Sequence, residues 1–216
     1  MVKHICLAVV LFSAAIPLSA EDQNLKPIKL APPQLTSGKT LMQALKDRQS
    51  ARSFSNRPLP IAILSQLLWA ADGINRPDSG KRTAPSAMNR QEIEIYVAAA
   101  DGLYLYNPRE HSVQPILMQD IRALTSRQLY AAEAALNLIY VADFSRVPGT
   151  VGAEDRLVFA AVQAGCISQN VSLYCAQEQL ATVVRASIDK EALAKAMRLS
   201  DHHKIILAQS VGYAKE

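Results

Sequence analysis

The residues best suited to bind an anion lie in one short segment, at the end of a predicted helix. Arg48, Ser50 and Arg52 alternate along it, and Gln49 lies between the first two. In an extended backbone alternate side chains point to the same side, so two guanidinium groups and a hydroxyl would converge there. Such a group suits a phosphate or another compact anion. The alternative is a solvated basic turn, which composition alone favours.

A second candidate segment belongs to a long polar stretch, residues 74–90, which has little periodicity. Loops of this length inside a compact domain usually have a function. The small residues around Pro85 and Ser86 would let a ligand approach the backbone, and the Asn89 amide offers both a donor and an acceptor. Such an amide can bind a heterocycle that presents carbonyl and N–H groups in alternation. The alternative is a capped turn that leads into a strand at Ile93.

The order and separation of these two segments resemble the nitroreductase superfamily, and within it the short branch related to the SagB-type dehydrogenases. The resemblance covers residues 40–213. It rests on Arg48-x-Ser50-x-Arg52-x-Phe54, on residues 67–76, on Pro85-Ser86-Ala87-x-Asn89-x-Gln91, and on similar stretches at 165–173, 181–185 and 211–213.

The resemblance implies an FMN-dependent oxidoreductase with an α+β fold, in which helices flank a mostly antiparallel sheet. It also implies an intertwined homodimer with the flavin at the subunit interface. Electrons would pass in ping-pong order from an unknown small-molecule donor to flavin N5, and then to a quinone- or nitroaromatic-like acceptor. Because the flavin carries this chemistry, we assign no catalytic side chain.

The same resemblance assigns the FMN site to three groups of residues. One would hold the phosphate and ribityl chain, a second would line the isoalloxazine ring, and the backbone of a third would approach the flavin from the other side. In that order the groups are Arg48, Gln49, Ser50 and Arg52; Pro85, Ser86 and Asn89; and Arg185, Ala186 and Ser187.

The sequence departs from the family pattern at two places, and the first of them, together with an expected export signal, supports a second hypothesis. Basic residues often follow the final strand of the family, whereas Lys215 is the only cation after Gly212 here. Ala186 and Ser187 stand where many relatives have an acidic residue followed by glycine. A degenerate member would keep the fold and bind a flavin or another small molecule without catalysis. The presence of the arginines, Ser50 and Asn89 favours the enzyme.

Cysteine and histidine add little further chemistry. Cys166 and Cys175 lie nine residues apart on one predicted helix, about 13.5 Å of rise, which is too far for a disulfide. We therefore expect two buried thiols. His202 and His203 follow Asp201, but no third metal ligand is near them in the sequence, so a polar surface turn is the favoured interpretation. We expect no metal site.

Composition limits the class of partner. The 216 residues are 50% hydrophobic and 19% charged, with a formal net charge of +4, as in an ordinary globular protein. Lysine and arginine are spread along the chain, so we expect no nucleic-acid partner. The eight glycines form neither the Gly-x-Gly-x-x-Gly pattern nor a P-loop, so these nucleotide-binding fingerprints are absent.

The first twenty residues are expected to be a secretory signal. Lys3 and His4 precede an apolar stretch at 5–12, and Leu18-Ser19-Ala20 forms a small-residue cleavage site. The apolar stretch is short for a membrane span, so we expect export, with the periplasm as the favoured destination and no stable membrane insertion after cleavage. An uncut N-terminal anchor is the alternative. Residues 21–39 would form an extended lead-in, and residues 40–216 the nitroreductase-like domain.

The elements that must position these residues are of mixed type. Periodicity predicts helices at 41–48, 61–72, 119–136, 154–178 and 190–198, and strands at 93–98, 103–106, 113–117, 138–142, 181–186 and 205–211. We expect Thr40 to cap the first helix and Asp101-Gly102 to form a hairpin turn. Helices and strands do not alternate strictly, so the predicted class is α+β.

Overall fold

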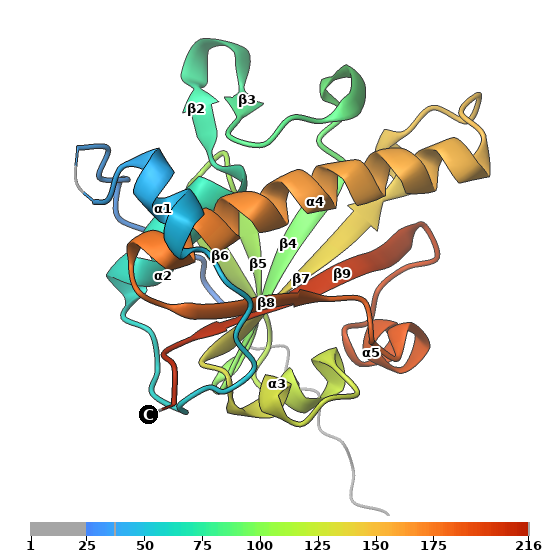
Figure 1. Cartoon of the computed structure of the whole chain (residues 1–216). Helices are drawn as coiled ribbons and strands as arrows, with labels where there is room; N and C mark the ends of the chain where they lie inside the picture. Colours follow the sequence, from blue (N-terminus) through green and yellow to red (C-terminus); the bar gives the residue numbers. More distant parts are fainter. Residues whose placement is uncertain (1–24, 37, 216) are drawn as a thin grey trace, which may run out of the picture.

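The centre of the molecule is one antiparallel sheet of seven strands with helices on both faces (Figure 1). The computed structural model describes residues 25–36 and 38–215, so the expected secretory signal lies outside the described residues. In spatial order the strands are β1 (Ile28–Lys29), β6 (Ser112–Leu117), β5 (Gly102–Asn107), β4 (Ile93–Ala99), β7 (Leu136–Asp143), β9 (His203–Gly212) and β8 (Ala181–Arg185). The α+β class is confirmed.

The six predicted strands all form, each within two residues of its expected ends. β7 lies between β4 and β9, and every one of its eight residues is buried. The polar stretch expected to be a loop contains a small hairpin, β2 (Ile74–Arg76) paired with β3 (Lys81–Arg82). It stands above the main sheet in Figure 1.

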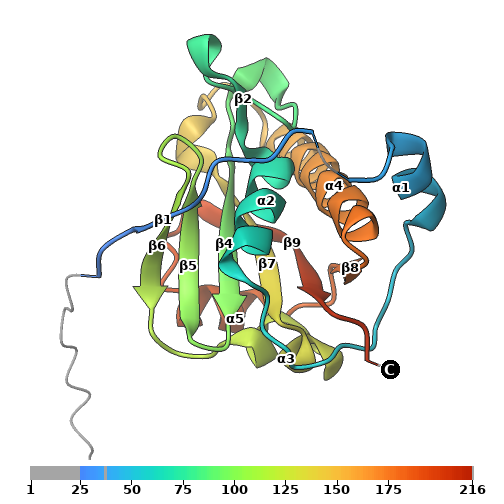
Figure 2. The same ribbon diagram turned by 90° about the vertical axis from the view of Figure 1, so that its left-hand side faces the viewer.

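The helices form two layers (Figures 1 and 2). α2 (Ile61–Asp72) and α4 (Ala153–Gln177) cover one face of the sheet, where α1 (Leu41–Asp47) packs beside α4. α3 (Tyr130–Glu133) and α5 (Lys190–Ala196) lie on the other face. As predicted, Thr40 caps α1. Its hydroxyl accepts a hydrogen bond from the Gln43 N–H, and the Gln43 side-chain oxygen accepts one from the Thr40 N–H.

The helix predicted over 119–136 is wrong. The segment instead forms a single turn, η3 (Arg122–Thr125), followed by the four residues of α3. Ser126 between them is extended, with φ −157° and ψ 153°. The Thr125 hydroxyl donates to the Arg122 carbonyl, and the Ser126 hydroxyl accepts the Gln128 N–H. These side chains compete with the helical ladder for backbone groups, which ends the helix.

α4 is the long helix on which the layer over the sheet depends. Among the described residues it alone is long and apolar enough to cross a membrane. Its inner face is instead part of the protein core, because Ala160, Ala164, Ile167 and Val171 are fully buried in the cluster formed with α2 and the sheet. Cys175 is also fully buried and Cys166 partly so, and both thiols are free, as predicted.

A buried arginine joins the last strands on the opposite face. The Arg185 guanidinium donates to Ser210 Oγ at 2.7 Å, Thr125 Oγ1 at 2.8 Å and Asn137 Oδ1 at 2.7 Å. Burial lowers the pKa of Arg185 to about 10, so it stays protonated at neutral pH. It therefore ties β7, β8, β9 and η3 together with charge-assisted hydrogen bonds.

Replacing Arg185 with alanine is expected to lower the free energy of unfolding by at least about 3 kcal/mol, because three buried acceptors lose their donor. Urea denaturation followed by circular dichroism measures the change. Arg127→Ala, at an exposed arginine in the same region, should change stability by less than about 0.5 kcal/mol. Equal effects of the two substitutions would contradict a structural role for the network.

Candidate functional site

The first predicted segment runs extended along the open edge of β8. The Ala51 N–H donates to the Thr182 carbonyl at 2.9 Å, and Phe54 forms a β-bridge with Ala214. Ala51 and Phe54 pack inward, and Phe54 is only 1% exposed. The other side chains of the segment point outward. Those of Arg48, Gln49, Ser50 and Arg52 are all exposed at the surface.

A basic cavity of about 560 Å³ opens beside this segment. Its walls come from Arg48 and Gln49 on one side and from the C-terminal end of α4, at Ser172 and Ala176, on the other. Lys46 also lines it, and neither Lys46 nor Arg48 forms an ion pair with any described residue. Lys39 and Asp47, which form an ion pair with each other, also line the cavity, so its net charge is positive. A positively charged cavity suits an anionic group such as a phosphate.

The chain returns to this segment at its described C-terminal end. The Ser55 N–H donates to the Tyr213 carbonyl at 2.9 Å, and the Lys215 N–H reaches the Ser53 carbonyl at 3.4 Å. Lys215 therefore lies next to the residues of the first segment. Lys215 thus places a cation after the final strand, beside the first segment, where the family pattern has basic residues.

The second predicted segment is a strained turn before β4. Met88, Asn89 and Gln91 have φ angles of 53°, 55° and 54°, in the left-handed region that non-glycine residues rarely adopt. The turn is held by Ser86, whose hydroxyl accepts the Gln91 N–H at 3.0 Å and whose carbonyl accepts the Asn89 N–H at 3.1 Å. Such strain is typical of ligand sites, where surrounding contacts fix an unfavourable backbone.

The Asn89 amide is presented at the surface of this turn. Its Oδ1 accepts from the Gln91 side chain at 3.0 Å, and the same Gln91 amide donates to the Gly80 carbonyl at 3.0 Å. Gln91 thus orients Asn89 against the β2–β3 hairpin. Pro85 and Asn89 are exposed and Ser86 is half-buried, so all three predicted residues are accessible from outside.

The third predicted group follows β8. Because the Arg185 side chain is committed to the internal network described above, only its backbone is available to a ligand. Ala186 and Ser187 are exposed, and the Ser187 carbonyl accepts the Arg127 N–H at 3.2 Å.

Within one chain, the first and second segments lie at opposite ends of α4 (Figure 1). The first segment faces Ser172 and Ala176, whereas Arg90, beside Asn89, has its guanidinium 5.8 Å from the ring centroid of Phe159. Thirteen residues of α-helix between Phe159 and Ser172 span about 20 Å. The fold of a single chain does not bring the predicted residues into one site.

Sequence reasoning missed a second cavity, of about 690 Å³, next to the second segment. Arg90 and Gln91 line it together with Asp72, Arg82 and Arg146. Asp72 and Arg82 are buried and form an ion pair. Burial raises the pKa of Asp72 to about 7, although the charge and the hydrogen bond of Arg82 act in the opposite direction. Asp72 is the last residue of α2, and the pairing of β2 with β3 brings Arg82 next to it. The sequence did not predict this pairing.

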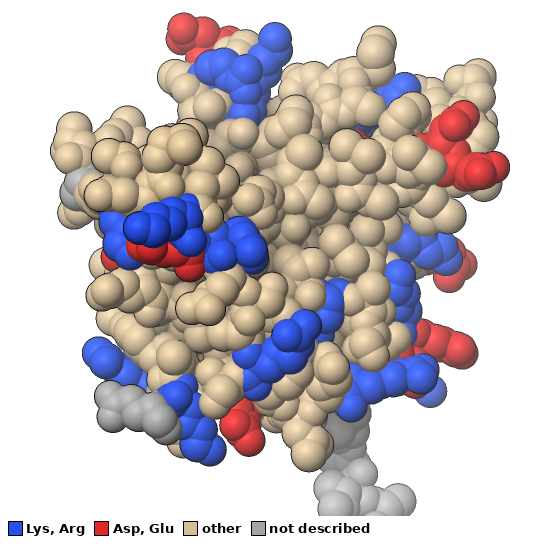
Figure 3. Space-filling model, in the orientation of Figure 1, with Lys and Arg blue, Asp and Glu red and all other residues tan. Residues whose placement is uncertain are grey.

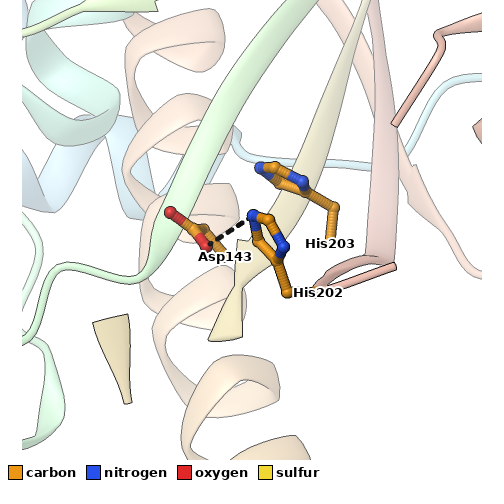
Figure 4. Close-up of side chains that lie close together, drawn as sticks. All are labelled: Asp143, His202 and His203. Atoms are coloured by element: carbon orange, nitrogen blue, oxygen red, sulfur yellow. Dashed lines mark ion pairs between the residues drawn. The ribbon is translucent and has the colours of Figure 1, made fainter. Parts of the chain in front are cut away.

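Sequence reasoning also missed a ligand for the histidine pair. No third ligand is near His202 and His203 in the sequence, but the fold places Asp143, at the end of β7, beside them (Figure 4). Possible ligand atoms of the three residues all lie within 4.8 Å of one another. Asp143 is far away in the sequence and becomes a neighbour only through the pairing of β7 with β9.

Comparisons with known proteins agree with this fold. The chain matches the Nitroreductase family over residues 45–213. It is 34% identical over 163 residues to a candidate nitroreductase of Methanocaldococcus jannaschii, covering 70% of this chain and 81% of that protein.

Solved structures extend the comparison. The crystal structure of a candidate nitroreductase from Ralstonia eutropha JMP134 is 39% identical, with a TM-score of 0.84 and coverage of 88% of this chain and 90% of that chain. The Escherichia coli microcin synthetase McbBCD complex contains a chain with the same fold, at a TM-score of 0.66 and 20% identity, covering 95% of this chain and 85% of that one. The chain therefore belongs to the nitroreductase family of oxidoreductases.

Proposed function

We propose that this protein is an FMN-dependent oxidoreductase of the SagB-type branch, and that its flavin sites are completed only in a homodimer. The observation that carries the proposal is the separation of the two predicted segments by the length of α4. A single site containing both segments needs a second copy of the chain.

The outer face of α4 carries exposed apolar residues that a partner would cover. It exposes Val158, Val162 and Gly165, with Leu157 and Ala161 beside them. Val162 is 61% exposed, although it is a large apolar residue. Figure 3 shows a broad uncharged tract over the middle of this helix, with lysine and arginine at its border near α1. Exposed apolar tracts rimmed by polar residues mark interaction surfaces.

Twofold pairing of two copies through this tract would build each flavin site from residues of both chains. Gly165 is the middle residue of α4, and the space around its missing side chain is open. A second copy crossing antiparallel at Gly165 would place the Arg48–Arg52 end of one α4 against the Pro85–Asn89 end of the other. In a twofold interface each contact occurs twice, so two equal sites result.

The residues at the two ends fit FMN. Arg48, Gln49, Ser50 and Arg52 would hold the phosphate and ribityl chain, with Lys215 nearby. The isoalloxazine ring would be lined by Pro85, Ser86 and Asn89 of the second copy. The other side of the flavin would be approached by the backbone of Arg185, Ala186 and Ser187. The strained turn keeps the Asn89 amide in place before the ligand arrives, which lowers the ordering cost of binding.

Bound FMN would supply reversible hydride transfer, and this chain would supply position and electrostatics. The 690 Å³ cavity beside the second segment has room for a small-molecule donor or acceptor. We place the reaction between an unidentified donor and a quinone- or nitroaromatic-like acceptor, in ping-pong order. From the N-terminal sequence, we place the protein outside the cytoplasm, in the periplasm.

Arg52→Ala is expected to weaken FMN binding by about 1.5–3 kcal/mol, about 10- to 150-fold, because a hydrogen-bonded cation is lost from the phosphate. Flavin fluorescence titration of the purified protein measures the affinity. Arg198→Ala removes an exposed arginine from the opposite face and should leave the affinity unchanged. The same affinity in all three proteins would remove Arg52 from the site. Retained flavin that no donor bleaches would support the non-catalytic alternative.

Co-expression of Arg52→Ala and Asn89→Ala chains tests whether the site is shared between copies. Each mixed dimer would have one intact site and one doubly altered site. Random pairing of equal amounts therefore recovers about one quarter of the wild-type flavin content, whereas either variant alone recovers little. Recovery no better than that of the single variants would show that both residues act within one chain.

Gly165→Glu is expected to give a monomer that has lost FMN, although all the predicted site residues are present. The new side chain has open space in the single chain, so the fold should survive, but two glutamates would meet at the crossing point. Analytical ultracentrifugation and bound-flavin absorbance give the two readouts. Ala132→Glu adds the same charge on exposed α3 and serves as the control. A flavin-loaded Gly165→Glu monomer would contradict the composite site.

A further inference from the structure

Three side chains that could bind one metal ion, Asp143, His202 and His203, lie together at one end of the sheet, outside the proposed flavin site, and Glu94 lies beside them. Glu94 comes from β4, Asp143 ends β7, His203 begins β9, and His202 lies in the turn before it. Strand register explains the gathering, because Asp143 pairs directly with His203. Glu94 pairs with Val141, two residues from Asp143, so all three strand residues share one face of the sheet.

The separations in this cluster exceed those of good hydrogen bonds. His202 Nε2 lies 3.7 Å from Asp143 Oδ1 (Figure 4). His203 Nε2 lies 3.5 Å from Glu94 Oε2. Nitrogen and oxygen ligands bind zinc at about 2.0–2.2 Å, and in a tetrahedron two such ligands lie about 3.3–3.6 Å apart. Ligand atoms of Asp143, His202 and His203 all lie within 4.8 Å of one another, whereas Glu94 lies beside His203 but outside this group. Three side chains are therefore placed to share one ion.

Neighbouring groups orient these ligands. Ser200 Oγ lies 2.6 Å from His203 Nδ1, which leaves the His203 Nε2 atom directed at the cluster. The same hydroxyl lies 3.2 Å from Nδ1 and 3.1 Å from Nε2 of His202, so it contacts both histidines. Arg146 Nε donates to Asp143 Oδ2 at 2.9 Å, so Oδ1 is the oxygen that faces His202. The Tyr96 hydroxyl donates to Glu94 Oε2 at 3.3 Å. Partners of this kind fix ligand geometry at known metal sites.

The charge of the cluster favours a cation. Two carboxylates and the Arg146 guanidinium, which also pairs with Glu94, leave one net negative charge when the histidines are neutral. The backbone N–H and the hydroxyl of Ser145 donate to Asp143 Oδ1, and Arg146 donates to Oδ2, so the carboxylate is held in place by three hydrogen bonds.

The cluster is also accessible from one side. The His202 side chain is 49% exposed, whereas those of Asp143 and Glu94 are 11% and 13% exposed. A hydrated ion could therefore enter past His202 and lose most of its water against the inner ligands.

We infer that Asp143, His202 and His203 form a site for one divalent zinc ion, with Glu94 beside it. Three protein ligands leave a fourth coordination position for a water molecule. The ion would join the ends of β7 and β9. Arg146 connects this site to the second segment, because its guanidinium donates to the Gln91 carbonyl at 2.9 Å.

Titration of the tag-free, flavin-free chain with Zn²⁺ in a calorimeter tests the site. We expect one ion per chain and a rise in melting temperature with added zinc. Asp143→Asn and His202→Ala should each weaken binding at least tenfold. His202 is half-exposed, so its substitution should leave the fold intact, as circular dichroism checks.

Asp201→Asn is the matched control, because it removes a carboxylate from the same turn without changing the three ligands, and it should bind zinc as the wild type does. Absence of zinc binding, or equal binding by the wild type and by an Asp143→Asn/His202→Ala double variant, would overturn the site. The measurement needs no flavin, so its outcome is independent of the proposed oxidoreductase activity.

Discussion

The burial of α4 against the sheet is the constraint on which the rest of the structure depends. Its inner face supplies fully buried alanines and aliphatic residues to the core formed with β4, β7 and β9. Because the helix is twenty-five residues long, it reaches from the basic segment at one end to the strained turn at the other. A helix apolar on both faces needs a second partner for the outer one. The same helix thus organises the fold of one chain and the proposed pairing of two.

Local sequence signals were sufficient for most elements. The Thr40 capping box, the helix 61–72 and six of the seven strands of the main sheet follow from periodicity, caps and turn residues. The failure at 119–136 has a physical cause: apolar spacing there is helical, but Thr125 and Ser126 hydrogen-bond to nearby backbone groups and divert the chain. Periodicity measures which residues are buried, not which groups satisfy the backbone.

The candidate site was harder to predict because its geometry depends on long-range pairing. The residue types in the two segments indicated an anion and a heterocycle, but no local pattern shows that about 20 Å of helix separates them. Asp143 was missed for the same reason. It lies 59 residues before His202, and only the register of β7 with β9 makes them neighbours. A ligand search limited to sequence proximity cannot find such a group.

β7 connects these observations. It is buried throughout, so its polar residues at either end, Asn137 and Asp143, must be compensated by partners. Each accepts a hydrogen bond from an arginine, Arg185 at one end and Arg146 at the other. Arg185 belongs to the strand end where the flavin would meet the backbone of residues 185–187, and Arg146 holds the Gln91 carbonyl next to Asn89. The two arginines that hydrogen-bond with the buried polar residues of β7 therefore also fix the backbone of both proposed binding regions.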